Sequence, residues 1–173
     1  MTGSRSAVIA ALGLGAALAG CGGTASHIDA GTFYSAKGYT VRLPDRGWRV
    51  QAQGAADLEL TRDTPPGGML ADATCVGPEP TRPLPILARH ATIGLGRRQT
   101  LESATETLDG RPAERTVVRG VLDGAPVTVE SIVVKGERCV HDFLYVAPPD
   151  AFESGRPDFR AFVQSFARRE ASR

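Results

Sequence analysis

The sequence predicts an α+β domain in which an antiparallel β-sheet carries one helix from mid-chain and one from the C-terminal end. Short segments of alternating apolar and polar residues, separated by glycine and proline, dominate from residue 32 onward. Two Asp-Gly pairs, at Asp109 and Asp123, lie between strand-like runs and are the strongest short-range hairpin signal. Two other stretches repeat apolar residues at helical spacing. Helices packed on an antiparallel sheet account for all three observations.

The chain begins with the pattern of a secretory signal peptide over residues 1–20. Arg5 supplies its only charge, ahead of an unbroken run of apolar residues and glycines over residues 7–19. This run is too short for a transmembrane helix, which needs ~20 apolar residues. The motif Leu18-Ala19-Gly20-Cys21 resembles the lipobox of bacterial lipoproteins, in which the cysteine is linked by a thioether to diacylglycerol. An ordinary secreted protein with an unrelated cysteine is the alternative.

The lipobox resemblance implies that Cys21 is the first mature residue and carries a lipid anchor with long acyl chains such as palmitate. Each buried methylene contributes ~0.8 kcal/mol, so two or three chains hold a protein stably in a bilayer. Gly22 stands where lipoproteins retained at the inner membrane of diderm bacteria commonly carry aspartate. The resemblance therefore implies sorting to the outer membrane, facing the periplasm or the surface, if the organism is diderm. Residues 21–32 are small and polar and predict a flexible tether.

The length of the chain after the leader predicts a single domain over residues 33–169, followed by a tail over residues 170–173. The whole chain has 20 basic and 19 acidic residues, and removal of Arg5 with the leader leaves the mature part formally neutral. A nucleic-acid surface, or a surface for anionic membranes, needs a clustered excess of base. We therefore expect no nucleic-acid partner.

Four short strands are predicted in the first half of the domain, each bounded by turn residues. They cover Tyr39–Pro44, Trp48–Gln51, Leu58–Arg62 and Met69–Val76. A helix follows, with proline at residues 83 and 85 in its first turn and an end at Gly94 or Gly96. Its apolar stripe consists of Leu84, Leu87, Ala88, Ala91 and Leu95.

The region from Gln99 to Ala147 predicts a four-stranded meander. Its strands cover Gln99–Leu108, Pro112–Leu122, Pro126–Val134 and Cys139–Val146. The last strand has bulky residues on both faces, so we place it near the centre of the sheet. After the meander, Asp150 and Glu153 have the spacing of a helix cap and its partner. An amphipathic helix carrying Phe159, Phe162, Val163 and Phe166 closes the domain against the sheet; a membrane-surface or partner-binding helix is the alternative.

Taken together, these segments resemble the PsbP-like fold, named for a lumenal photosystem II protein and found in many small bacterial lipoproteins. The similarity covers residues 33–166. It rests on the strand over residues 39–44 followed by Gly47-Trp48, on the helix and long meander, and on the closing helix after Ala147-Pro148-Pro149. It implies a non-catalytic accessory protein that binds a larger assembly and needs no cofactor.

Cys75 and Cys139 are not part of that resemblance. They lie 64 positions apart in a chain predicted to be exported, where two such cysteines usually pair. We therefore predict a disulfide between them. A free nucleophilic thiol and a metal-binding pair are the alternatives.

His141 and Asp142 are the remaining candidate functional residues. Strand alternation places Cys139 and His141 on one face and Asp142 on the other. A Cys-His metal site needs a third ligand that the sequence does not supply, so we expect a packed His141 and no metal. An acid pair of Glu130 with Asp142, meeting across neighbouring strands, is the geometry considered for glycan hydrolysis. No catalytic serine or zinc-protease motif is present.

These observations predict a lipid-anchored, non-enzymatic envelope lipoprotein that serves as a binding or accessory module for an envelope protein complex. Its partners are the bilayer, through acylated Cys21, and an envelope protein. The first alternative is a small-molecule or lipid-binding lipoprotein with a pocket between the sheet and the mid-chain helix. An envelope hydrolase that uses Cys139 or the acids is the second.

Overall fold

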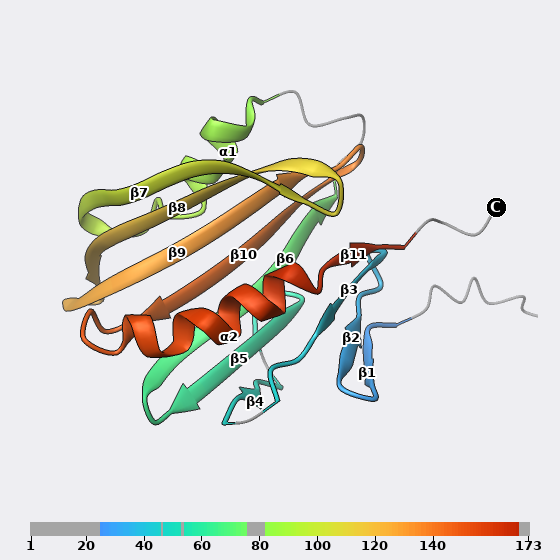
Figure 1. The fold of residues 1–173 in the computed structure, drawn as a ribbon, viewed down its shortest axis with the longest axis horizontal. Coiled ribbons are helices and arrows are strands. Elements are labelled where there is room, and N and C mark those ends of the chain that lie inside the picture. The colour runs from blue at the N-terminus through green and yellow to red at the C-terminus, as the bar shows by residue number, and fades with distance from the viewer. Residues whose placement is uncertain (1–24, 46, 53, 76–81, 170–173) are drawn as a thin grey trace, which may run out of the picture.

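A computed structural model describes residues 25–45, 47–52, 54–75 and 82–169, which form two antiparallel sheets and two helices (Figure 1). The predicted signal peptide, the predicted lipobox with Cys21, and the predicted tail over residues 170–173 lie outside the described residues. Within the described part of the chain, neither helix is long and apolar enough to cross a membrane.

The larger sheet has seven strands in the order β4-β5-β6-β10-β9-β8-β7. The last four of these form the predicted meander, and β10 lies at the centre, so both predictions are confirmed. In chain order the strands are β4 (Arg49–Val50), β5 (Leu58–Asp63), β6 (Pro66–Cys75), β7 (Gly96–Leu108), β8 (Arg111–Leu122), β9 (Ala125–Lys135) and β10 (Cys139–Ala147).

Both Asp-Gly pairs form the hairpin turns of the meander. Asp109 and Gly110 have φ values of 48° and 72°, and Asp123 and Gly124 have φ values of 50° and 84°. Positive φ at both central residues defines the turn whose twist matches that of the flanking strands. These two turns fix the register of β7 on β8 and of β8 on β9.

The helix α2 (Phe152–Gln164) crosses one face of the large sheet and encloses the main core (Figure 1). It buries Phe159, Phe162 and Val163 against strands that include β10 and β6. The N-cap residue of α2 is Ala151, and no side chain caps the first turn of the helix. The predicted cap by Asp150 is therefore wrong. Glu153 pairs instead with Arg156 within the helix.

The helix α1 (Leu84–His90) lies on the opposite face, against β9 and β8. Ala88 packs there against Val133 and Val140. The predicted helix is too long, because hydrogen bonds from the Ile93 and Leu95 amides reach back only three residues. The chain turns there to start β7, which removes Leu95 from the helical stripe.

A smaller sheet of four strands lies beside α2, in the order β1-β2-β3-β11. It consists of β1 (His27–Asp29), β2 (Thr32–Tyr34), β3 (Tyr39–Arg42) and β11 (Ala167–Arg168). The hairpin of β1 and β2 occupies part of the range that we predicted as a flexible tether. The predicted strand over residues 39–44 therefore belongs to this sheet and not to the meander.

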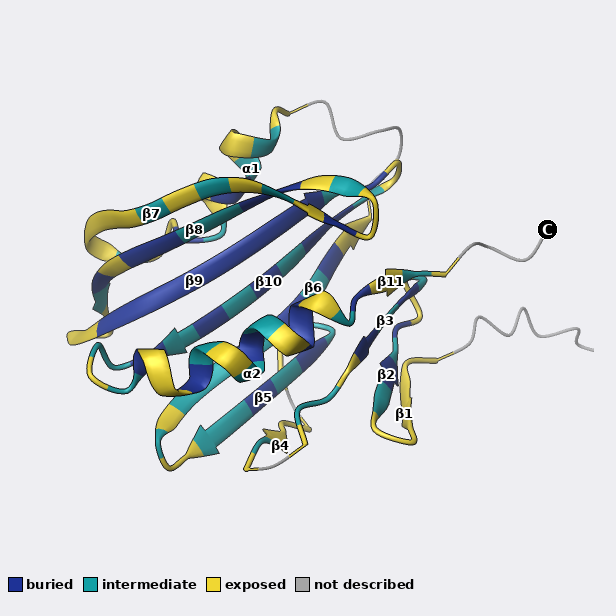
Figure 2. Ribbon diagram, viewed as in Figure 1, coloured by how far each residue is buried: buried dark blue, intermediate teal, exposed yellow. Residues whose placement is uncertain are grey.

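Figure 2 shows where the buried residues concentrate. From Val127 to Val134, β9 is buried without interruption. This pattern follows from its position, since α2 and α1 cover parts of the two faces of the strands around it. In that buried run, Thr128, Glu130 and Ser131 are polar and the other residues are apolar.

Candidate functional site

The two candidate residues of β10, His141 and Asp142, point to opposite faces of the large sheet. His141 is in register with Ala73 and Val134, and Asp142 with Asp72 and Val133. Although they are adjacent in sequence, the two residues therefore do not belong to one site. Each has to be considered with the side chains of its own face.

His141 lies in the aromatic core between the two sheets. It is 3% exposed, and its ring centroid lies 5.4 Å from that of Tyr39 and 4.9 Å from that of Phe166. Its Nδ1 atom has no hydrogen-bond partner. Burial, together with the positive charge of Arg168, lowers the pKa of His141 to about 4. This environment keeps the imidazole neutral and removes it from solvent.

Cys75 and Cys139 occupy paired positions on β6 and β10. Their sulfur atoms lie at bonding distance, 2.08 Å, which supports the predicted disulfide. A sulfur in this state cannot act as the nucleophile of a Cys-His pair. Among the described residues, no group of three or more metal-binding side chains comes together.

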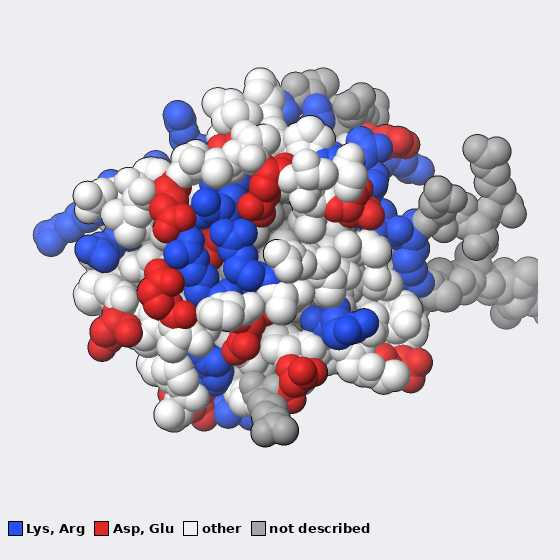
Figure 3. Space-filling view, in the orientation of Figure 1, with Lys and Arg blue, Asp and Glu red and all other residues white. Residues whose placement is uncertain are grey.

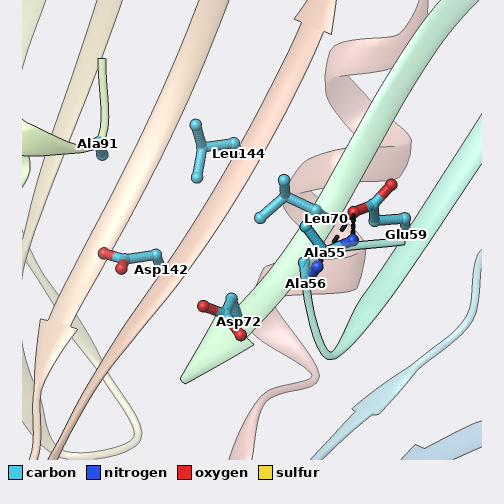
Figure 4. Close-up of a pocket in the computed structure, with 8 residues that line it drawn as sticks. All are labelled: Ala55, Ala56, Glu59, Leu70, Asp72, Ala91, Asp142 and Leu144. Atoms are coloured by element: carbon cyan, nitrogen blue, oxygen red, sulfur yellow. Dashed lines mark hydrogen bonds between the residues drawn. The ribbon is translucent and has the colours of Figure 1, made fainter. Parts of the chain in front are cut away.

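Asp142 lines an open pocket of about 240 Å³ between the sheet and the end of α1 (Figure 4). The small-molecule alternative predicted a pocket at this place, between the sheet and the mid-chain helix. Its apolar lining comes from both the sheet and the segment after α1, and Asp72 and Glu59 add further carboxylates. The complete lining is Ala55, Ala56, Glu59, Leu70, Asp72, Ala91, Asp142 and Leu144.

The carboxylates of this pocket differ in how they are held. The Glu59 side chain accepts hydrogen bonds from the amides of Ala55 and Ala56 at 2.8 and 3.1 Å, and so fixes the loop before β5. Asp72 is paired with Lys37 at 3.2 Å. No described residue donates a hydrogen bond to the Asp142 carboxylate. Burial and the negative charge of Asp72 raise the pKa of Asp142 to about 6.

Lys37 connects this pocket to the smaller sheet through a second carboxylate. Its Nζ lies 2.7 Å from Asp57, which also accepts hydrogen bonds from the Tyr39 hydroxyl at 3.0 Å and from the Ala73 amide at 3.1 Å. Asp57 is therefore fully engaged. Asp142 is the carboxylate in this group that is left to interact with anything entering the pocket.

Glu130 does not join Asp142, so the expected acid pair is wrong. Glu130 is in register with Tyr145 on β10 and faces α2, whereas Asp142 faces α1. The two side chains are separated by the sheet because they have opposite parity on adjacent strands. Glycan hydrolysis by this pair is thereby ruled out.

Glu130 is instead the centre of an arginine network, seen in Figure 3 as intermingled blue and red between α2 and the strands. Its carboxylate is 0% exposed and lies 3.0 Å from Arg156, 2.7 Å from Arg160 and 3.9 Å from Arg115. Burial raises the pKa of Glu130, and the positive charges of the arginines oppose this effect. Glu102 and Glu106 bind the outer sides of the same arginines.

This network joins α2 to β7, β8 and β9 through charge. The Glu130 Oε2 atom accepts a hydrogen bond from Arg156 Nε, whereas Oε1 lies 2.7 Å from Arg160 Nε without a hydrogen bond, so the carboxylate acts here as the buried counter-charge of the arginines. The sequence contained one signal for it that we did not use. Arg156 and Arg160 lie four residues apart on the helix, away from its apolar stripe.

Comparison with known proteins shows the fold alone. The chain matches no protein-family model and no curated protein. Among solved structures, LpqN of Mycobacterium tuberculosis, described as involved in cell envelope biogenesis, has a TM-score of 0.59 at 15% identity over 76% of this chain and 84% of LpqN. A protein of Bacteroides thetaiotaomicron has a TM-score of 0.57 at 10% identity, over 80% of this chain and 48% of that protein.

The cyanobacterial PsbP protein of Synechocystis has a TM-score of 0.58 at 13% identity. The match covers 87% of this chain and 98% of that protein. The PsbP-like fold that the sequence resembles is thus confirmed. This chain is an α+β domain of the PsbP-like fold, which also occurs in LpqN, a protein described as involved in cell envelope biogenesis.

Proposed function

We propose that this protein is a lipid-anchored, non-enzymatic accessory module of a bacterial cell envelope that binds a protein complex. The observation that carries the location is the lipobox-like motif over residues 18–21 at the end of an apolar leader. LpqN, which shares the fold, is described as a protein of cell envelope biogenesis, and this supports the same compartment.

The start of β1 sets the length of the connection to the anchor. With β1 beginning at His27, residues 22–26 remain between Cys21 and the folded part of the chain. A fully extended segment of this length reaches at most ~18 Å. The anchored domain is therefore held close to the bilayer surface, and its N-terminal side faces the membrane.

Binding is favoured over catalysis because three of the candidate polar side chains, His141, Cys139 and Glu130, are held by the fold. His141 is packed in the aromatic core, Cys139 is at bonding distance from Cys75, and Glu130 is held by arginines. None of these groups combines a free reactive atom with a base in reach.

The proposal is tested by chemical crosslinking in intact membranes followed by affinity purification, with the wild type and Cys21→Ser compared. We expect a stoichiometric envelope protein with the wild type and its loss with the unacylated variant. Labelling of wild type, but not of Cys21→Ser, by a palmitate analogue tests the anchor separately. Recovery of no partner with either form would contradict the accessory role.

The pocket beside Asp142 supports a second candidate function, binding of a small amphiphilic molecule. Leu70 and Leu144 would contact its apolar part, and the Asp142 carboxylate would receive an amine or hydroxyl group. Native mass spectrometry of protein purified without denaturation tests this function. A ligand retained by the wild type and lost from Leu144→Trp would support it, whereas a bare mass for both would exclude it.

A further inference from the structure

The surface around α1 and the start of β7 carries four exposed arginines that are close in sequence. We call it the α1–β7 end, and it comprises Arg82, Ile86, Arg89, Ile93, Arg97 and Arg98. All six side chains are exposed, with Ile86 at 38% and Ile93 at 71%. Isolated exposed isoleucines are ordinary, but these are interleaved with four positive charges.

These six residues lie just before α1, on α1, in the turn after it and at the start of β7. Ile86 and Arg89 are three residues apart on α1, where Ala88 is buried against the sheet, and Ile93 lies in the turn that follows the end of the helix at His90. Arg98 donates a hydrogen bond to the carbonyl of Thr92 at 3.3 Å, which holds the start of β7 against the turn after α1. Arg82 Nη1 lies 3.5 Å from His90 Nδ1 at the end of the same helix.

Many arginines elsewhere are paired with carboxylates, although Arg42, Arg119 and Arg138 are exposed without an ion pair to a described carboxylate. The described ion pairs join arginines to carboxylates across the rest of the surface: Arg49 with Asp63, Arg62 with Asp158, Arg111 with Glu137 and Arg168 with Asp109. None of the four arginines of the α1–β7 end is paired with a described carboxylate. The formal neutrality of the mature chain therefore conceals a local excess of positive charge.

Two further exposed apolar residues lie near the α1–β7 end. Leu122, 39% exposed, ends β8 beside the start of β7, and Leu101, 42% exposed, lies farther along β7. Apolar anchors surrounded by arginine are the composition of protein–protein interfaces. An acidic partner surface complements the arginines, and a basic surface is repelled by them.

The position of this end relative to the anchor indicates which kind of partner it meets. In Figure 1 the described chain begins beside β1, whereas β7 begins at the other end of the long axis of the molecule. A lipid on Cys21 would hold the β1 side at the bilayer, so the start of β7 would be turned away from that membrane, with α1 between the two along the long axis (Figure 1). This placement favours a protein over the lipid surface that carries the anchor.

We propose that the α1–β7 end is the docking surface for an acidic protein partner, with Ile93 as its apolar anchor and Arg97 and Arg98 as its charge contacts. This inference rests on the proposed accessory function and specifies the surface and the partner chemistry. The interaction is salt-sensitive, because exposed ion pairs are screened over about 10 Å at 0.1 M salt.

Site-specific photo-crosslinking of the full chain in intact cells tests the docking surface. A photo-crosslinking amino acid is placed at position 93 and, as the matched control, at the exposed Val50, which is 44% exposed on β4. We expect one discrete protein adduct from position 93 and none from position 50. The double variant Arg97→Glu/Arg98→Glu is expected to reduce that adduct at least tenfold.

The charge-matched control is Arg42→Glu/Arg138→Glu, because both arginines are exposed and unpaired with described carboxylates but lie outside the α1–β7 end. It should leave the adduct unchanged. Equal adducts from positions 93 and 50, crosslinking of position 93 to lipid alone, or equal effects of the two double variants would overturn the docking surface. A partner crosslinked only from position 50 would overturn this inference and leave the accessory function intact, whereas no adduct from either position would contradict both.

Discussion

Asp142 on β10 lies directly opposite Asp72 on β6, so two carboxylates face the same side of neighbouring antiparallel strands. Like charges in this position destabilise a sheet. Lys37 pairs with Asp72 but has no recorded contact with Asp142. The fold therefore keeps one poorly compensated carboxylate beside the pocket, and its titration should be measurable.

Replacing Asp142 tests this directly. A carboxyl whose pKa is raised to about 6 holds its proton in the folded state between pH 4 and pH 6 while the unfolded chain releases it, so stability falls as pH rises through this range. Asp142→Asn removes that loss, and its free energy of unfolding at pH 7 should rise by about 3 kcal/mol. Chemical denaturation measures the change. The exposed Asp150→Asn should have no effect, and equal values for both variants would refute the assignment.

His141 contributes with the opposite sign. Its folded pKa of about 4 lies below the value of 6.5 for an unperturbed histidine, so acidification between these values protonates only the unfolded chain and lowers stability. In the wild type the titration of Asp142 offsets this effect. Asp142→Asn should therefore lose up to about 3 kcal/mol between pH 7 and pH 4. Adding His141→Leu should flatten the profile, and a profile that stays steep would exclude His141 as the source.

The Cys75–Cys139 pair links strands that are 64 positions apart in sequence. Closing a loop of this length restricts the unfolded chain by about 4 kcal/mol. The double variant Cys75→Ser/Cys139→Ser should lose close to that amount in the free energy of unfolding, as should the reduced wild type. Denaturation curves with and without reductant measure both. If reductant leaves the wild-type curve unchanged, the pair is not a disulfide in the folded protein.

The arginine network predicts a large difference between two glutamates. Glu130→Gln leaves Arg115, Arg156 and Arg160 without their buried counter-charge and should cost about 3 kcal/mol. Glu153→Gln, at a side chain that is 74% exposed and also paired with Arg156, should cost less than 1 kcal/mol, the scale of exposed ion pairs. Thermal unfolding compares the two. Similar melting temperatures would show that the network does not hold α2.

Gly155 sets how closely α2 approaches the sheet. A methyl group at this position would overlap the Tyr145 hydroxyl and approach the Arg62 guanidinium. Gly155→Ala should therefore destabilise the protein by about 2 kcal/mol, the usual cost of overpacking. Gly94→Ala is the control, because nothing lies within 4 Å of its added methyl group. An equal response of both variants in thermal unfolding would exclude this close contact.

The local parts of the fold could be predicted from sequence, and the long-range parts could not. The meander follows from Asp109 and Asp123, since each turn determines the pairing of the strands next to it. Pairing of β6 with β10 joins segments separated by the whole meander, and no local pattern specifies it. That register brings Asp142 to Asp72 and Cys139 to Cys75. The cysteines were predictable because exported cysteine pairs form disulfides, whereas carboxylates carry no such signal.

The same distinction explains the network around Glu130. Strand alternation predicts which face of the sheet the Glu130 side chain occupies on β9. Its arginine partners come from α2, however, and the placement of a helix on a sheet depends on side-chain packing. The early end of α1 and the two-residue β11 were not predicted, for a related reason. Each ends or begins where the chain must meet a distant strand, as Arg168 meets Tyr39.

The measurement that tests the accessory role most directly is native electrophoresis of the protein released from membranes by mild detergent. If it is a docked accessory subunit, most of it should migrate in one assembly far larger than the monomer in its micelle, and Arg97→Glu/Arg98→Glu should release the monomer. Migration of the wild type as the monomer alone, under conditions that preserve other envelope complexes, would contradict the account.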